Sequence, residues 1–573
     1  DRSPKWANEG KQMIWFSNRN GLKSYATSGS TEYDVYSMFF TQEGWDEYQL
    51  SEEEFKLQQA IEEAQKASKD GEKDQAKEKV GDDGKDEKDT LLSFDWDDVE
   101  DRVSRLTIHS SRLSDAVLNK EGTKLYYLTR FDGGYDLWST DLRTRDTKVA
   151  ISLGGSSGQL MWDASHENLY LLSGGRVSKL EPEKGSKKSI SIASEAIIDA
   201  DKERLAMFDH IALRTSKIFY EPTFHGIDWE AIVRDYRPKV AHLGHDFEFA
   251  ELISELVGEL NVSHAGGRYR GARGGDETAS LGIFIDYNHR EDGLKVAEII
   301  SGGPLDKAHL EISEGDIITH IDGELVSKNK DWAYYLNQKT NKRVLLNVTD
   351  PKGKNTREMV VQPVSLGSLN GLLYTRFVDM NEAEVLRRSN GRLGYVHIPG
   401  MGDRQFREVF DRMLGKHFDK EAIVVDARNN GGGDLVADLQ MFFTGTRFLT
   451  YATEQMVVGG EPTSRWTKPI IGLFNEDMYS DGHCYASAFS DLDLGTMVGT
   501  PVPGTCSFAG WEGLPNGSVW GVVPVSAKNK AGEWLENHQT MPDIMIRNHP
   551  GVVDFGRDEQ LEAAVKQMLK ELG

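Results

Sequence analysis

Ser480 lies between a strand-like run and a helical pattern, and this junction constrains the fold more than any other stretch of the sequence. The run Pro469–Phe474 has the length and composition of a buried strand, and Ala486, Phe489 and Leu492 then recur at helical intervals. The serine hydroxyl is therefore expected at the positive end of a helix, beside backbone N–H groups without intrahelical partners. That position suits a nucleophile, but Ser-Asp-Gly before a helix is also the pattern of a plain N-cap.

The alternation of strand and helix extends over residues 365–573. Leu393–Ile398 and Ala422–Asp426 are apolar runs of strand length, and Gln405–Leu414 between them has helical spacing. Strands that alternate with helices form parallel sheets, whose strand carboxyl ends carry the functional loops. We therefore expect an α/β catalytic domain with a mainly parallel sheet.

The loop Asn430–Gly433 follows one of these strands and contains three consecutive glycines. Glycine permits close backbone approach, so the Gly432 N–H can be aimed at a substrate oxygen, and the Asp481 N–H would complete an oxyanion hole. The same glycines can also form a simple tight turn. A phosphate-binding loop is a further alternative, but the Lys-Ser/Thr ending of that motif is absent.

A nucleophilic serine needs a base, and two of the 15 histidines are candidates. His483 is close to Ser480 in sequence, but its side chain is expected to point along the new helix. His264 precedes Gly266 and Gly267, which could let its loop reach across to the serine. Taken alone, His264 is more often a loop histidine without a special role.

The N-terminal third shows recurring strand and turn patterns, within residues 1–50 and 93–198. Trp6–Ser17, Leu118–Tyr127 and Trp162–Leu171 each combine a polar turn with a strand-like run. Hairpins of this kind are typical of β-propeller blades. Because the spacing between copies is irregular, the sequence predicts a partial propeller.

An acidic insertion, residues 51–92, separates the two propeller segments. Residues 51–90 contain 14 acidic side chains, 8 basic ones and a single aromatic, Phe55. Such a segment cannot bury enough apolar surface to offset the entropy lost on ordering. We expect a solvated helix in its first half and disorder in the second.

Helical spacing then predicts a small helical domain over residues 199–275, which carries His264. Residues 279–364 are β-rich and resemble a PDZ domain, with Ser280-Leu-Gly-Ile-Phe as the carboxylate-binding loop. A PDZ domain binds peptides by adding a strand and holding a terminal carboxylate. The alternative is a domain that serves only packing or gating.

Composition excludes several classes of protein. A formal net charge of −25 argues against nucleic acid as a partner, and no run of 18 apolar residues could span a membrane. The two cysteines, Cys484 and Cys506, cannot form a four-cysteine zinc site; either one disulfide or, as favoured here, two buried free thiols is expected. No metal or cofactor is expected. The chain starts without Met, so we expect a processed piece; its compartment, cytoplasmic or periplasmic, stays open.

Four motifs occur in a distinctive order along the chain. They are Val262–Ala265, Asp426–Gly433, Asn475–Gly482 and the Glu536-Asn537 pair followed by Pro542-Asp543. In this combination the sequence resembles the tricorn protease family, relatives of the carboxyl-terminal processing peptidases. The resemblance extends over nearly the whole chain, from propeller through PDZ-like unit to α/β domain.

The resemblance implies a role for each matching residue. Ser480 matches the nucleophile, His264 the general base, Ser263 the serine that orients the catalytic groups and Glu536 the carboxylate that completes the tetrad. The N–H groups of Asp481 and Gly432 match the oxyanion hole. No metal or cofactor takes part, and homo-oligomers are expected because members of the family form ring-like assemblies.

The sequence also departs from the family pattern. The family usually has Glu-Asn-x-Gly-Val before its Pro-Asp, where this chain has Glu536-Asn-His-Gln-Thr540. The propeller region is too short for the family's two full propellers. A preference for basic residues in the substrate is not carried over, because the acidic residue that confers it has no identifiable counterpart.

The sequence thus predicts a serine endopeptidase that cleaves peptides or unfolded polypeptides through an acyl-enzyme. The competing hypothesis is a noncatalytic peptide-binding scaffold built from the propeller and PDZ-like units. An ester-cleaving α/β hydrolase is a third alternative, but the sequence has no Gly-x-Ser-x-Gly elbow.

Overall fold

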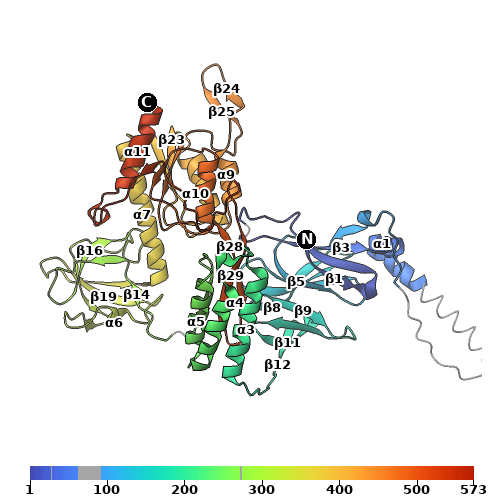
Figure 1. Cartoon of the computed structure of the whole chain (residues 1–573). Helices are drawn as coiled ribbons and strands as arrows, with labels where there is room; N and C mark the ends of the chain where they lie inside the picture. The colour runs from blue at the N-terminus through green and yellow to red at the C-terminus, as the bar shows by residue number, and fades with distance from the viewer. Residues whose placement is uncertain (27–28, 62–91, 272–273) are drawn as a thin grey trace, which may run out of the picture. The chain divides into compact units, whose positions relative to one another are not determined.

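The computed structural model describes residues 1–26, 29–61, 92–271 and 274–573, which divide into two compact units, Asp1–Ile197 and Ile198–Gly573 (Figure 1). Residues 52–61 are helical, as expected for the start of the acidic insertion. The expected disorder of its second half falls outside the described residues. None of the described helices is both long and apolar enough to cross a lipid bilayer.

The first unit consists of antiparallel sheets of four strands each, the size of a propeller blade. The first sheet consists of β1 (Arg2–Ala7), β2 (Gln12–Ser17), β3 (Asp34–Phe39) and β4 (Val103–Arg105), and the second of β5 (Arg112–Leu118), β6 (Lys124–Arg130), β7 (Tyr135–Asp141) and β8 (Thr147–Gly155). The third consists of β9 (Gly158–Trp162), β10 (Leu169–Ser173), β11 (Arg176–Glu181) and β12 (Ser186–Ile190). Helix α1 (Gln42–Gln49) follows β3 and precedes the helical residues 52–61. The three expected hairpins correspond to β1–β2, β5–β6 and β9–β10. The Asn119 side chain closes one of them by accepting the N–H groups of Thr123 and Lys124.

The second unit begins with three helices, α3 (Ala200–Ile218), α4 (Trp229–Tyr236) and α5 (Asp246–Gly258). Asp199 and Asp228 cap the first two by accepting N–H groups of the first turn. The helices bury an apolar core that includes Phe208, Phe249 and Leu256. They correspond to the helical domain expected from the 3.6-residue pattern.

A hairpin from far along the chain completes this helical core. Strands β28 (Ser507–Gly513) and β29 (Ser518–Ser526) pair with each other, and β29 also pairs with β13 (Gly266–Tyr269). Trp520 of β29 is buried in the same core as the helices, and Figure 1 shows both strands beside them. The expected division, with 365–573 as one continuous α/β domain, is therefore wrong for this hairpin. Its apolar face is buried by helices more than 250 residues earlier in the sequence, a partner that local patterns do not reveal.

The PDZ-like unit is a six-stranded antiparallel sheet with a short helix and a small two-stranded sheet. Its elements are β14 (Ala279–Ser280), β15 (Ile283–Ile285), β16 (Leu294–Ile299), β17 (Ile317–Ile321), β18 (Glu324–Leu325), α6 (Ala333–Leu336), β19 (Val344–Thr349), β20 (Arg357–Val361) and β21 (Val364–Ser365). Strand β15 lies at the edge of the sheet, directly after the predicted carboxylate-binding loop. In that loop the Gly282 N–H donates to Ser280 Oγ at 3.0 Å.

The remainder of the second unit is the expected α/β domain. Five parallel strands have the order β22-β23-β26-β27-β30, and α7 and α11 bury one face of this sheet. The elements are α7 (Leu366–Arg388), β22 (Leu393–His397), α8 (Asp403–Asp411), β23 (Ala422–Asp426), α9 (Val436–Phe443), β24 (Leu449–Ala452), β25 (Val457–Glu461), β26 (Ile470–Phe474), α10 (Asp481–Asp491), β27 (Met497–Gly499), β30 (Ile544–Met545) and α11 (Glu559–Leu572). The loops after β23 and β26 lie at the carboxyl edge of neighbouring central strands, where this class of sheet places its sites.

Candidate active site

Ser480 is the N-cap residue of α10, at the turn that joins β26 to this helix. Its backbone has φ 58° and ψ −128°, a combination that is strained for a residue with a side chain. The Ser480 N–H donates to Thr505 Oγ1 at 2.9 Å, and the Ser480 carbonyl accepts the N–H of His483. The strand-to-helix turn predicted from the sequence is confirmed, and its strain is of the kind that functional sites retain.

Gly432 packs directly against the serine turn. A methyl group on Gly432 would lie 2.5 Å from Ser480 Cβ, 2.8 Å from the Tyr479 carbonyl oxygen and 3.1 Å from the Asp481 nitrogen. Its φ of +87° is also one that favours glycine. The structure therefore brings together the two residues predicted to form the oxyanion hole.

The two N–H groups of this predicted hole differ in their availability. Asp481 is the first residue of α10, so its N–H has no intrahelical acceptor. The Gly432 N–H instead donates to Oδ1 of Asn430 at 2.9 Å. A substrate oxygen would have to replace this amide oxygen before Gly432 could act as the second donor.

The carboxylate of Asp481 connects the two loops. Its Oδ2 accepts the N–H of Leu435 at 2.7 Å, at the start of α9. Burial raises the pKa of the Asp481 carboxyl, and the hydrogen bond from Leu435 opposes that shift. The side chain thus links the start of α9, which follows the glycine loop, to the serine turn.

Ser263 and His264 lie in the loop between α5 and β13. The His264 N–H donates to the Tyr479 hydroxyl at 2.8 Å, and the two rings stack with their centroids 4.6 Å apart. Tyr479 directly precedes Ser480, so these contacts hold the histidine beside the serine turn. Burial lowers the pKa of His264 and the charge of Glu536 partly opposes this shift, which favours the neutral imidazole that a general base requires.

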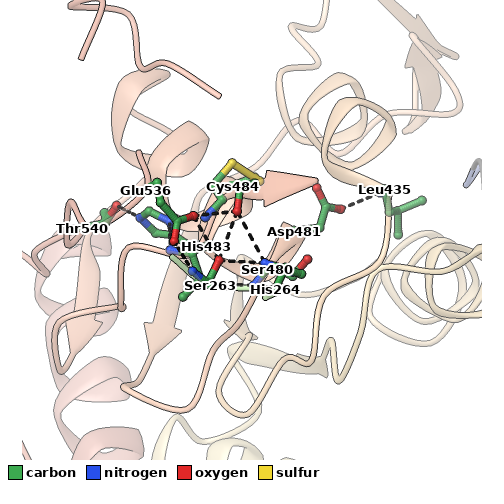
Figure 2. The surroundings of a disulfide bond; sticks show 12 residues. Ser263, His264, Leu435, Ser480, Asp481, His483, Cys484, Glu536 and Thr540 are labelled. Atoms are coloured by element: carbon green, nitrogen blue, oxygen red, sulfur yellow. Dashed lines mark hydrogen bonds between the residues drawn. A yellow bond between two sulfur atoms is a disulfide. The ribbon is translucent and has the colours of Figure 1, made fainter. Parts of the chain in front are cut away.

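Glu536 and Ser263 form a row of hydrogen bonds that ends on the histidine (Figure 2). One oxygen of Glu536 accepts the Ser263 N–H at 2.5 Å, and the other lies 3.0 Å from Ser263 Oγ. Ser263 Oγ is 2.7 Å from Nδ1 of His264. The departure from the family pattern after Glu536 therefore does not prevent its carboxylate from reaching Ser263. Asn537 helps to hold this loop, since its side-chain amide donates to the Asn261 carbonyl at 2.7 Å.

The row of hydrogen bonds does not extend from His264 to the Ser480 hydroxyl. In the part of the chain that the structure describes, no hydrogen bond joins Ser480 Oγ to His264. Catalytic hydrogen bonds are often long in the absence of substrate and form only in the complex. Tyr479, which directly precedes Ser480, contacts His264 through both its hydroxyl and its ring.

His483, the alternative base, is committed elsewhere. Its Nδ1 accepts the N–H groups of Thr505 at 3.0 Å and Cys506 at 3.1 Å, which leaves the ring hydrogen on Nε2 to donate to Thr540 Oγ1 at 3.0 Å. Burial lowers the pKa of His483 to about 4. The ring therefore points into the segment around Cys506, not along α10 as expected, and it serves packing.

Cys484 and Cys506 form a disulfide, with their Cα atoms 5.0 Å apart (Figure 2). The favoured prediction of two free thiols is thus wrong. The bond connects α10 to the segment that leads into β28. Two cysteines 22 residues apart give no local signal of pairing, because the pairing depends on the turn that places β28 beside the helix.

Three residues at this site were not predicted: Tyr479, Thr505 and Ser507. Ser507 Oγ lies 2.6 Å from an oxygen of Glu536. Thr505 and Ser507 flank Cys506. A prediction of the disulfide between Cys506 and α10 would therefore have placed both residues beside Ser480. Among the described residues, no group of three or more His, Cys, Asp or Glu side chains is arranged to hold a metal ion.

A strained serine at a helix N-terminus, a glycine loop packed against it and a His-Ser-Glu row define a candidate serine hydrolase site. Comparison with known protein families shows which proteins the segments of the chain resemble. Residues 200–258 match the tricorn protease C1 domain, 281–365 the tricorn protease PDZ domain and 392–546 peptidase family S41. Three segments of the chain are thus similar to domains of the tricorn proteases and to peptidase family S41.

Individual relatives are similar to this chain over part of their own length. The chain is 28% identical over 437 residues to the tricorn protease of Thermoplasma volcanium, covering 74% of this chain and 41% of that protein. It is 28% identical over 369 residues to the tricorn protease homolog of Saccharolobus solfataricus, covering 60% and 33%. The crystal structure of the tricorn protease superposes with a TM-score of 0.77 at 18% identity, covering the whole of this chain and 55% of that one. The chain thus spans less than half the length of these two curated relatives.

Proposed function

We propose that this chain is a serine endopeptidase that cleaves peptides or unfolded polypeptides through an acyl-enzyme. The single observation that carries the proposal is the convergence of Ser480, the Gly432 loop and the His264–Ser263–Glu536 row from four separate segments. A noncatalytic scaffold would not need a strained serine at this point. The names of the relatives, which are proteases, support the same activity.

The proposed first step is attack of Ser480 Oγ on the scissile carbonyl carbon. Nε2 of His264 takes the hydroxyl proton, and the carbonyl oxygen becomes an oxyanion. The Asp481 N–H is positioned for this oxygen, and the Gly432 N–H joins it when the oxygen replaces Asn430 Oδ1. Collapse of the tetrahedral adduct breaks the C–N bond, and His264 gives its proton to the leaving amine.

The other members of the row keep the histidine in the tautomer that this step needs. Since Glu536 only accepts hydrogen bonds when ionised, Ser263 donates its hydroxyl hydrogen to Glu536. Toward His264, Ser263 Oγ then acts as the acceptor of Nδ1–H, which leaves Nε2 unprotonated and able to take a proton. The carboxylate also stabilises the imidazolium formed during attack, and water repeats the cycle to release the acyl group.

The remaining units are assigned supporting roles within this proposal. The free edge of β15 suits addition of a peptide strand, so the PDZ-like unit would recruit peptide ends or gate access. A homo-oligomer is proposed by analogy with the family.

The activity is tested by single-turnover acylation on a peptide ester with Ser480→Ala, His264→Ala and the double variant. Ser480→Ala should abolish acylation, and His264→Ala should be almost as damaging. The double variant should lose little more, because residues of one catalytic unit are strongly non-additive. If the fold is retained in thermal melts and His264→Ala still acylates at the parental rate, the base is misassigned; peptide binding without any acylation by the parent would favour the scaffold.

A further inference from the structure

The hydroxyl of Ser507 lies closer to the catalytic carboxylate than the hydroxyl of the predicted orienting serine does. It is the first residue of β28 and is 5% exposed. Its Oγ lies 2.6 Å from Oε2 of Glu536, whereas Ser263 Oγ lies 3.0 Å from the same oxygen. Ser507 Oγ is also 3.1 Å from Ser263 Oγ and 3.5 Å from His264 Nδ1, the latter at the outer limit of a hydrogen bond. No family motif and no sequence pattern pointed to this residue.

The donors and acceptors around Glu536 define the role of the Ser507 hydroxyl. An ionised Glu536 is acceptor-only, so both hydroxyls that contact Oε2 donate to it, while Oε1 accepts the Ser263 N–H. Because the Ser507 hydrogen is given to Glu536, it does not compete with His264 for the lone pairs of Ser263 Oγ. The hydrogen bond from Ser507 also holds Oε2 of Glu536 where it can accept the hydroxyl hydrogen of Ser263.

The backbone of Ser507 is held from both sides. The preceding Cys506 is bonded to Cys484 on α10, and Ser507 pairs with Ser526 in the β28–β29 ladder. Two residues earlier, Thr505 Oγ1 accepts the N–H of Ser480. The segment 505–507 therefore contacts both ends of the catalytic row, the nucleophile through Thr505 and the carboxylate through Ser507.

We propose that Ser507 is a positioning residue of this active site, which acts through Glu536 and Ser263 to hold His264 in its base-competent tautomer and orientation. It does not touch substrate or take a proton. The inference rests on the proposed peptidase function and adds one member to the group of residues that carries it.

The test compares two variants of nearly the same shape, Ser507→Thr and Ser507→Val, which differ in one hydroxyl. Hydrogen bonds to charged groups contribute enough that losing this one should slow single-turnover acylation about ten- to a hundredfold in Ser507→Val. The acylation rate of Ser507→Thr should stay within about threefold of the parental rate, because the hydroxyl is kept. Peptide affinity should be unchanged in both variants. Equal acylation rates in the two variants would overturn the proposal.

Two further variants guard against a purely structural explanation. Ser507→Ala removes the hydroxyl without adding volume and should match Ser507→Val if the fold is retained. Ser518→Ala is the matched control, a buried serine of the same sheet whose hydroxyl has no hydrogen-bond partner, and it should acylate at the parental rate.

A double-mutant cycle decides whether Ser507 acts through the carboxylate. In a Glu536→Ala background, Ser507→Ala should cost less than about threefold, because its partner is already absent. A full loss in that background would assign Ser507 a different role and refute the inference. If Ser480→Ala proved active, the proposed function would fail independently of any result with Ser507.

Discussion

Removal of the Cys484–Cys506 disulfide should weaken both the fold and the chemistry. The bond joins residues 22 apart in sequence, and the chain-entropy relation for a loop of that length gives about 3 kcal/mol of stabilisation at 25 °C. The same bond holds the segment 505–507, which contacts Ser480 and Glu536. We therefore expect loss of the bond to slow acylation in addition to lowering the free energy of unfolding.

The assay is urea unfolding and single-turnover acylation, each with and without reductant. The sequence has only these two cysteines, so any effect of the reductant on the chain comes from this bond. Cys484→Ala combined with Cys506→Ala should reproduce the reduced parent and should not respond to reductant. The reasoning is refuted if thiol titration shows two free thiols in the reduced parent while its unfolding midpoint and acylation rate stay unchanged.

Three further predictions follow from the site. Gly432→Ala would place a methyl group 2.5 Å from Ser480 Cβ and should lower the acylation rate by about 10²–10³. Gly391→Ala is the control, because Gly391 also has a positive φ but open space around it, and its acylation rate should be unchanged. Equal acylation rates in the two variants would contradict the close packing. Because burial lowers the pKa of His264, the acid limb of kcat/KM should have its midpoint below about 6.5, and a midpoint above that value would argue against His264 as the base. His483 has a pKa of about 4 in the folded chain and about 6.5 in the unfolded chain. The free energy of unfolding of the parent should therefore fall by up to about 3 kcal/mol as the pH falls from 6.5 to 4. In urea unfolding, His483→Gln should show a smaller fall over the same pH range.

Local patterns in the sequence were sufficient for the elements that carry their own signal. The apolar run before Ser480 and the helical spacing after it predicted β26, the turn and α10, because burial on one face imposes a period on the residues. The motifs around His264 and Glu536 named residues that the structure brings to within two hydrogen bonds of each other. The peptidase family S41 match includes Ser480 and Glu536, whereas His264 lies between the two matched tricorn domains.

Contacts between distant segments were not accessible in this way. The β28–β29 hairpin belongs to the helical core because Trp520 is buried there, and nothing within the hairpin specifies that partner. The disulfide and Ser507 depend on this placement, so they were missed with it. The direction of the Gly432 N–H was also unpredictable, since it depends on whether Asn430 Oδ1 or a substrate oxygen occupies the acceptor position.

The central claim is that Ser480 is a nucleophile activated by His264, and covalent labelling tests it most directly. The parent chain is incubated with a serine-directed peptidyl phosphonate and the modified residue is located by mass spectrometry. We predict a single adduct on Ser480, formed far more slowly in His264→Ala and absent in Ser480→Ala. An adduct on another serine, or labelling of His264→Ala at the parental rate, would contradict the account.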